Sequence, residues 1–569
     1  MGGDFPLNDD WSYGETTRVF LDSGRLYMPA ACAAGFAHIF WGAFFTKIFG
    51  FSYIVLRYAS VLAGAIGAIF AYFALLELGV TRRKSLYCAL LYAGNPIMLN
   101  LYLGFMSDVS ALTLSAAYFY LLLAGLKRHS VKHLIFALLC LLTAVSVRQS
   151  AVVFALAAPA FLFSPPDAAR VWSMSRRLGY SAIFLLLPIA TFMAVDRWLM
   201  LRETTGQSLV DHYSAARIGH SSYLLGFFQA PFDQVLKSIA AIGVVLCYVG
   251  LFTAPLLLAS TIDFCRALFQ KKVTIYWPVT GPALLAALLV CLISAYYEVN
   301  VRHAQMPFCE NILRITSVGA QGIMGIANPL LTARQKVRLT AASYFLAFLA
   351  LCQLFTMVGL TVVHVRKALQ SSGGKFKLQL LSRFASPSVV VLATSCVATL
   401  GFLMVETIVR CTDRYYLIAL LPIILALAHF SKLSNLRFSD WVGTALLTLF
   451  LGYSIFGGQD YITSNAARWR ALTKLEKQDV SASIIDGGAE YNVSRDINVY
   501  ASHFRGAPPR DSWRWWPIKG EEYIVSFSPV PGYDELWHER YFSLMTMSVH
   551  PVYVLKNAHV VPTDSKLNK

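Results

Sequence analysis

Long apolar segments recur along this chain and limit what it can fold into. A helix needs about 20 apolar residues to cross a hydrocarbon core about 30 Å thick. Over the whole chain 57% of the residues are apolar and 14% are charged, whereas soluble domains have about 45–50% and about 25%. A polytopic α-helical membrane protein is therefore predicted. The twelve predicted spans are residues 55–79, 86–104, 109–126, 133–147, 150–164, 179–198, 236–258, 276–298, 339–364, 388–408, 415–430 and 440–458.

Positive charge is concentrated in every second loop between these spans. These loops are residues 80–85, 127–132, 165–178, 259–275, 365–387 and 431–439. They hold 19 Lys and Arg against two acids, so their net charge of +17 equals that of the whole chain. Short loops rich in Lys and Arg stay in the cytoplasm. The charge therefore indicates topology in an inner or plasma membrane, and no nucleic-acid partner is expected.

The same topology divides the chain into three parts. Residues 1–54 form an extracytoplasmic first loop with interfacial helices, because the stretch 38–50 is apolar but too short for a confident span. Residues 55–458 form the transmembrane domain. Residues 459–569 carry 13 basic and 13 acidic side chains and predict a small soluble α+β domain outside the membrane. We expect this domain to aid acceptor binding rather than chemistry.

Twelve spans leave the first loop outside, with no apolar helix before it to carry it across the membrane. We therefore expect the native start to lie upstream of Met1 and to add a thirteenth span.

Acidic side chains at the outer ends of spans are the candidate catalytic groups. Asp9 and Asp10 precede a helix-like stretch, and Asp108 lies near the outer end of the span that starts at residue 109. A carboxylate at the rim of an apolar bundle can act as a general base. Asp at these positions is also a favourable helix cap, so the pattern alone leaves both roles open.

Basic and aromatic side chains lie on the same predicted side. Arg148 separates two short spans, and Arg414 and Tyr415 begin the span near residue 415. An Arg at this rim can bind a lipid phosphate through two parallel hydrogen bonds. Interfacial Arg and Tyr are equally common as membrane anchors, and both readings stay open.

Taken together, these segments resemble a known family. Four segments are similar to segments of lipid-linked-sugar glycosyltransferases with the C-type fold. They are the first loop (PLNDDWSYGETTRVF, then LDSGRLYMP), LRYASVLAGAIGAIFAYFALLELG, YAGNPIMLNLYLGFMSDVSALTLSAAYFYLLLAG and DRYYLIALLPIILALA. The resembling family is the bacterial part of the protein O-mannosyltransferase and aminoarabinose transferase superfamily. One segment departs from it, since this chain reads AAGFAH at 33–38 where aminoarabinose transferases show Lys-Pro-Pro-Leu.

The resemblance implies a role for each candidate residue. Asp9 matches the family's catalytic loop acid, Asp10 takes the place of its usual Glu, and Asp108 matches its second acid. Arg414 matches a residue that meets the donor's phosphate, with Arg148 and Tyr415 as further phosphate-binding candidates. The implied activity is inverting transfer of a sugar from a polyprenyl-phosphate donor to an envelope glycan, lipid or protein acceptor.

Two other functions remain at this stage. A polymerase or ligase of lipid-diphosphate-linked glycans also uses many spans and long outer loops. A transporter or flippase of lipid-linked sugars is disfavoured because the middles of the spans are almost without charge. No cofactor is required by any of these schemes, and a divalent metal ion is left open.

Overall fold

The computed structural model describes residues 3–28, 34–163, 172–201, 207–270, 276–297, 300, 312–313, 318–319, 333–371, 386–409, 412–430, 440–495 and 521–558. Within these ranges, nine helices are long and apolar enough to cross a membrane. The chain is therefore a multi-pass α-helical membrane protein, as predicted. The nine are α3 Tyr53–Glu77, α6 Ser107–Arg128, α8 Met174–Leu199, α10 Pro231–Phe269, α11 Trp277–Tyr296, α12 Ala333–Ser371, α14 Pro387–Val409, Asp413–Phe430 (η4 Asp413–Tyr416 with α15 Leu417–Phe430) and α16 Asp440–Glu476.

One predicted span, 86–104, is divided into two helices, α4 Arg82–Ala93 and α5 Pro96–Tyr102. Asn95 caps α5 by accepting a hydrogen bond from the Ile97 amide, and Pro96 occupies its first turn. Gly94 lies at the break because α16 approaches it closely: a Cβ there would lie 1.9 Å from a methyl carbon of Leu451. Neither helix is among the nine, because the Asn-Pro break divides the predicted span.

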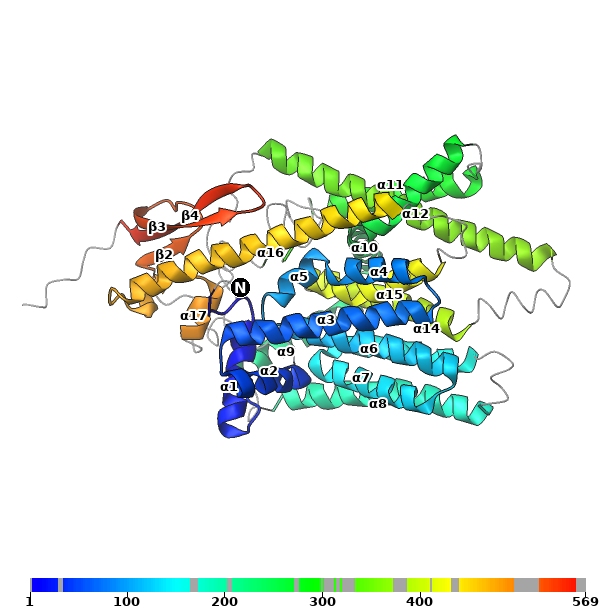
Figure 1. The fold of residues 1–569 in the computed structure, drawn as a ribbon, viewed down its shortest axis with the longest axis horizontal. Coiled ribbons are helices and arrows are strands. Elements are labelled where there is room, and N and C mark those ends of the chain that lie inside the picture. The colour runs from blue at the N-terminus through cyan, green and yellow to red at the C-terminus, as the bar shows by residue number, and fades with distance from the viewer. Residues whose placement is uncertain are drawn as a thin grey trace, which may run out of the picture.

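Two further predicted spans, 133–147 and 150–164, correspond to shorter helices. The α-helix α7 Val131–Val147 has 17 residues, and the 3-10 helix η1 Gln149–Phe163 has 15. A 3-10 helix rises about 2.0 Å per residue, so η1 is about 30 Å long, similar to the thickness of a hydrocarbon core. Helix α6 packs between α3 and α7, and α8 packs against α7 and η1; Figure 1 shows α3, α6, α7 and α8 in this order across the bundle.

The first loop contains two helices outside the long bundle helices. Helix α1 Asp10–Ser23 is polar on average and ends at Gly24, whose φ of 70° suits a residue without a Cβ. Helix α2 Phe36–Phe49 exposes Phe40, Phe44 and Phe49. Such a surface fits the predicted interfacial position, which stays a prediction.

The end of α16, which shares a core with the sheet, and the part after residue 476 form a small mixed domain. Its four-stranded sheet has the order β1-β2-β4-β3, with β1 Ile485–Asp486 parallel to β2 Tyr523–Ser526 and the other pairs antiparallel. The other two strands are β3 Tyr533–Ser543 and β4 Ser548–Asn557. The segments ASIID (482–486), EYIVSFSP (522–529) and PVYVLK (551–556) have strand patterns that predict β1, β2 and β4. No such pattern predicts β3, in which charged and apolar side chains do not alternate regularly.

Helix α16 joins this domain to the bundle. The predicted span ends at 458, and the helical spacing of ARWRALTKLEKQ (467–478) predicts a separate helix. In the structure α16 is continuous over 37 residues, or about 55 Å. Figure 1 shows α16 running out of the bundle to the sheet, with α1 and the short helix α17 Ala489–Arg495 at the same end of the molecule. The first loop and the small domain therefore meet.

Candidate active site

The predicted acid Asp108 lies in the first turn of α6, where the helix dipole favours a negative charge. Its Oδ2 atom lies 2.5 Å from Nη1 of Arg148, the residue that ends α7, and both side chains are more than 90% buried. The Ser107 hydroxyl lies 3.5 Å from the same Nη1 and 2.8 Å from the Tyr13 hydroxyl of α1. The buried pair therefore joins α6 to the end of α7, and the hydrogen bond between Ser107 and Tyr13 joins the first loop to this site.

The predicted base Asp9 precedes α1 and faces the predicted phosphate ligand Arg414. Their Oδ2 and Nη1 atoms are 2.8 Å apart. The Asp9 side chain is 25% exposed and that of Arg414 is 9% exposed. Residues 405 positions apart in the sequence thus form an ion pair at the rim of the bundle, on the side that solvent reaches.

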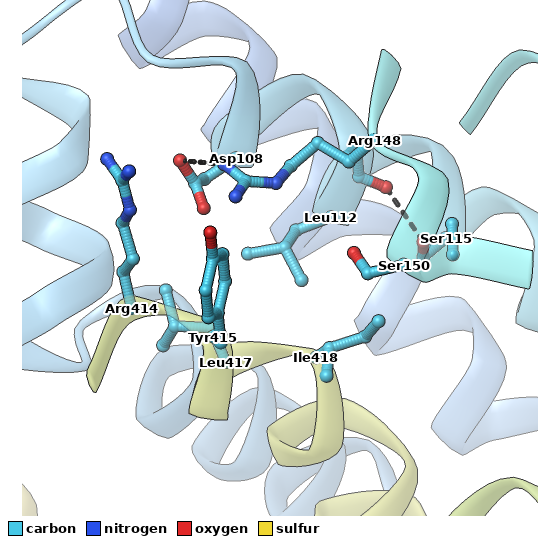
Figure 2. Close-up of a pocket in the computed structure, with 11 residues that line it drawn as sticks. Asp108, Leu112, Ser115, Arg148, Ser150, Arg414, Tyr415, Leu417 and Ile418 are labelled. Carbon is cyan, nitrogen blue, oxygen red and sulfur yellow. Dashed lines mark hydrogen bonds and ion pairs between the residues drawn. The ribbon is translucent and has the colours of Figure 1, made fainter. Parts of the chain in front are cut away.

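Tyr415 lies between the two arginines. The Arg148 and Arg414 guanidinium carbons are 5.2 and 5.9 Å from the centre of its ring, within cation–π range. Figure 2 shows the Tyr415 side chain pointing toward the Asp108 carboxylate, with one arginine on either side. Two arginines and the Asp108 carboxylate therefore lie around a single aromatic ring.

A pocket opens beside these groups. Its polar wall includes Asp108, Arg148 and Arg414, and its other walls are mostly apolar (Figure 2). Three segments supply the lining: the first half of α6, the junction of α7 with η1, and η4 with the start of α15. The lining residues are Asp108, Ala111, Leu112, Ser115, Arg148, Ser150, Ala151, Arg414, Tyr415, Leu417 and Ile418. An apolar pocket with a few convergent charges is a typical ligand site.

Asp10 has a different environment from Asp9. It is completely buried and accepts hydrogen bonds from the amides of Leu7, at 2.5 Å, and Phe105, at 3.5 Å. Burial raises the pKa of the Asp10 carboxyl well above its usual range, and the Arg57 charge and the two amides oppose this increase only in part. Asp10 is not among the residues that line the pocket.

Two residues of the site region were not singled out from the sequence. Arg57, fully buried in α3, donates to the carbonyl oxygens of Gly3, at 2.8 Å, and Phe5, and so holds the first loop. Asp413, next to Arg414, accepts hydrogen bonds from the Ile312 and Leu313 amides at 2.7–3.0 Å. A fully buried acid is unusual unless it is paired, but burial is not visible in the sequence.

The described ranges contain no group of three or more His, Cys, Asp or Glu side chains that could hold a metal ion.

Comparison with known proteins agrees with the resemblance found in the sequence. Residues 35–195 match the family model described as dolichyl-phosphate-mannose-protein mannosyltransferase. No curated protein matches the chain in sequence. Among solved structures, ArnT from Cupriavidus metallidurans bound to undecaprenyl phosphate is similar, with 11% identity, a TM-score of 0.35 and coverage of 98% of this chain and 95% of that chain. The apo state of ArnT from Cupriavidus metallidurans is similar too, with 11% identity, a TM-score of 0.34 and coverage of 98% of this chain and 94% of that chain.

The family match runs from α2 into α8 and includes Asp108 and Arg148, whereas Asp9, Asp10 and Arg414 lie outside it. The matched segment holds 161 of the 569 residues, and over that segment the chain is similar to this glycosyltransferase family, in agreement with the resemblance found in the sequence.

Proposed function

We propose that this protein is an inverting glycosyltransferase that moves a sugar from a polyprenyl-phosphate donor to an acceptor hydroxyl on the extracytoplasmic face of the cell membrane. The observation that carries the proposal is the meeting of two arginines and two predicted acids beside one pocket. The name of the matching family supports a lipid-phosphate sugar as the donor class. The loop charges support the extracytoplasmic orientation.

Arg414 and Arg148 are the proposed ligands of the donor phosphate. Both line the pocket, and both guanidinium groups lie within 6 Å of the Tyr415 ring centre. Guanidinium groups form strong charge-assisted hydrogen bonds with phosphate oxygens. Tyr415 separates the two like charges and gives each of them a π face. In this arrangement the apolar walls formed by Leu112, Leu417 and Ile418 would meet the apolar parts of the donor.

Asp9 is the proposed general base. In the unliganded protein its carboxylate is held by Arg414 at 2.8 Å. A donor phosphate that binds Arg414 competes with this contact and leaves the partly exposed Asp9 carboxylate available to an acceptor. Donor binding and release of the base are then one event, in which the Arg414 guanidinium exchanges the Asp9 carboxylate for the donor phosphate.

The chemical step is a single displacement. Asp9 accepts the proton of the acceptor hydroxyl while the acceptor oxygen forms a bond to the anomeric carbon of the sugar. The bond from that carbon to the phosphate oxygen breaks, and the electron pair leaves with the polyprenyl phosphate, whose charge Arg414 and Arg148 stabilise. One displacement inverts the anomeric configuration.

Asp108 and Asp10 have supporting roles in this scheme. Asp108 fixes Arg148 by its 2.5 Å contact and lies where it can also face the sugar in the pocket. The two amides that Asp10 binds belong to the first loop and to the turn before α6. Asp10 therefore fixes the loop that carries Asp9.

Mass spectrometry of envelope glycans tests the proposal. Cells lacking the gene are compared with cells that regain either the wild-type chain or Asp9→Asn at equal protein level. We expect one sugar to be missing from a glycan, lipid or protein without the gene, and to return only with the wild-type chain. A change in polymer length would instead support the polymerase or ligase, and unchanged envelope masses would overturn the proposal.

A further inference from the structure

The first loop is bonded directly to the small C-terminal domain. The Asn8 backbone amide donates a 2.9 Å hydrogen bond to Oε1 of Glu490, 482 residues later in the chain. Asn8 has a φ of 54°, a left-handed conformation that is uncommon outside glycine and more accessible to Asn than to most residues. Because Asn8 immediately precedes Asp9, its backbone conformation sets the direction in which the Asp9 side chain leaves the loop.

Glu490 is itself fixed by a buried arginine. Its Oε2 atom lies 2.8 Å from Nη2 of Arg468 on α16, and the two side chains are 4% and 1% exposed. Arg468 also donates to the Gly487 carbonyl oxygen at 2.9 Å and to Oδ1 of Asn465 at 3.0 Å. A carboxylate held by such a network has little freedom to move, and it presents a fixed acceptor to the loop.

Apolar contacts accompany this hydrogen bond on both sides of Asp9. The Phe5 ring stacks on the Trp469 ring of α16, with centroids 6.1 Å apart and planes inclined by 15°. After Asp9, Trp11 forms a buried cluster with Val493 of α17. The small domain therefore contacts the loop before Asp9, at Asn8 and after Asp9.

We infer that Glu490, held by Arg468, is a positioning residue that orients the Asp9 carboxylate through the Asn8 amide. The inference rests on the proposed function, in which Asp9 is the base. It assigns part of the active-site geometry to the C-terminal domain. The sequence-based expectation that this domain aids acceptor binding rather than chemistry does not account for these contacts.

The bundle holds the same loop from the opposite side. Arg57 of α3 binds the carbonyl oxygens of Gly3 and Phe5, and its guanidinium carbon lies 4.7 Å from the Phe5 ring centre. Loss of Glu490 would thus leave the loop attached to the bundle, while the peptide at Asn8 could rotate. A misplacement of about 1 Å of a catalytic group can reduce a rate about 100-fold.

The test uses the full-length protein and three variants. Glu490→Ala removes the acceptor of the Asn8 amide, and Glu490→Gln keeps an oxygen for it. Glu476→Ala is the matched control, because Glu476 is a carboxylate of the same domain that pairs with Arg495 and Tyr491. Three quantities are measured: sugar transfer in cells, binding of undecaprenyl phosphate to purified protein, and hydrogen exchange of peptides covering residues 5–11.

We expect Glu490→Ala to reduce transfer about 10- to 100-fold, to leave undecaprenyl phosphate binding within about twofold, and to accelerate exchange near Asn8. Glu490→Gln should restore much of the transfer and of the protection, and Glu476→Ala should change neither. Equal transfer in Glu490→Ala and Glu476→Ala, with Asp9→Asn inactive, would overturn the inference while leaving the proposed function intact. An active Asp9→Asn would overturn the proposed function instead.

Protection of the sheet peptides 523–526 and 548–557 shows whether Glu490→Ala folds. If it does not fold, Phe5→Ala provides the test from the loop side, since it removes the stacking on Trp469 without changing the domain. Faster exchange near Asn8 together with reduced transfer in Phe5→Ala supports the inference. Normal transfer despite faster exchange overturns it.

Discussion

The buried pair of Asp108 and Arg148 provides a sharp test of the site's construction. Asp108→Asn removes one charge of the pair and leaves the Arg148 guanidinium in a site where both original side chains are less than 10% exposed. The neutral Asn also loses the favourable interaction of a carboxylate with the first turn of α6. We therefore expect this single atom exchange to destabilise the folded protein as well as to impair transfer.

The magnitude follows from burial. Exposed ion pairs contribute about 0–1 kcal/mol, whereas removing one partner of a buried pair costs about 3–5 kcal/mol. Arg148 keeps the Ser107 hydroxyl and the Tyr415 ring as neighbours, so the lower part of that range, about 3 kcal/mol, is expected for Asp108→Asn. The double variant Asp108→Asn with Arg148→Gln should lose less than the sum of the two single variants, because it leaves no unpaired buried charge.

Unfolding of the purified protein in mixed micelles with increasing denaturing detergent measures these free energies. Glu15→Gln is the control, because Glu15 pairs with Arg18 at side-chain exposures of 37% and 57%, and we expect a change of no more than about 0.5 kcal/mol. The reasoning is refuted if Asp108→Asn changes the unfolding free energy as little as Glu15→Gln does. It is also refuted if the changes in unfolding free energy caused by the Asp108 and Arg148 substitutions add up in the double variant.

Three further predictions concern the pocket and the packing around it. Arg414→Ala should weaken undecaprenyl phosphate binding as well as transfer, since it removes a phosphate ligand; unchanged binding in a titration would exclude that role. Tyr415→Phe keeps the ring between the arginines and should retain the transfer rate within about threefold, whereas Tyr415→Leu should not. Equal transfer rates in these two variants would show that the ring is dispensable. Gly94→Ala should destabilise the fold by about 1–3 kcal/mol through its clash with Leu451, and adding Leu451→Ala should relieve it in the same unfolding assay.

The helical architecture could be predicted because a bilayer requires long apolar segments and asymmetric loop charge, which are both properties of the sequence. Helix breaks were harder to predict. The Gly94-Asn95-Pro96 turn lies inside a run that is mostly apolar, although Asn95 as a cap and Pro96 in the first turn of α5 are signals of a new helix. Strand β3 was missed because it lies at the edge of the sheet, where most of its side chains are at least partly exposed and alternation is weak.

The candidate site could be assembled only in part. Loop charge and family resemblance placed Asp9, Asp108, Arg148 and Arg414 at one membrane face, and the structure pairs each acid with one arginine. The pairing itself was not predictable, because it joins residues 405 positions apart in one case. Nor could the sequence separate Asp9 from Asp10, since these adjacent acids differ only in burial.

Transfer by Asp9→Asn compared with Asp10→Asn tests the central claim most directly. Each variant is produced at the same level in membranes, and sugar transfer is measured together with undecaprenyl phosphate binding. If Asp9 is the base, Asp9→Asn should bind the lipid and transfer about 100- to 10,000-fold more slowly. Asp10→Asn, whose side chain can still accept a loop amide, should stay within about tenfold of wild type. Near-normal transfer by Asp9→Asn would contradict the account.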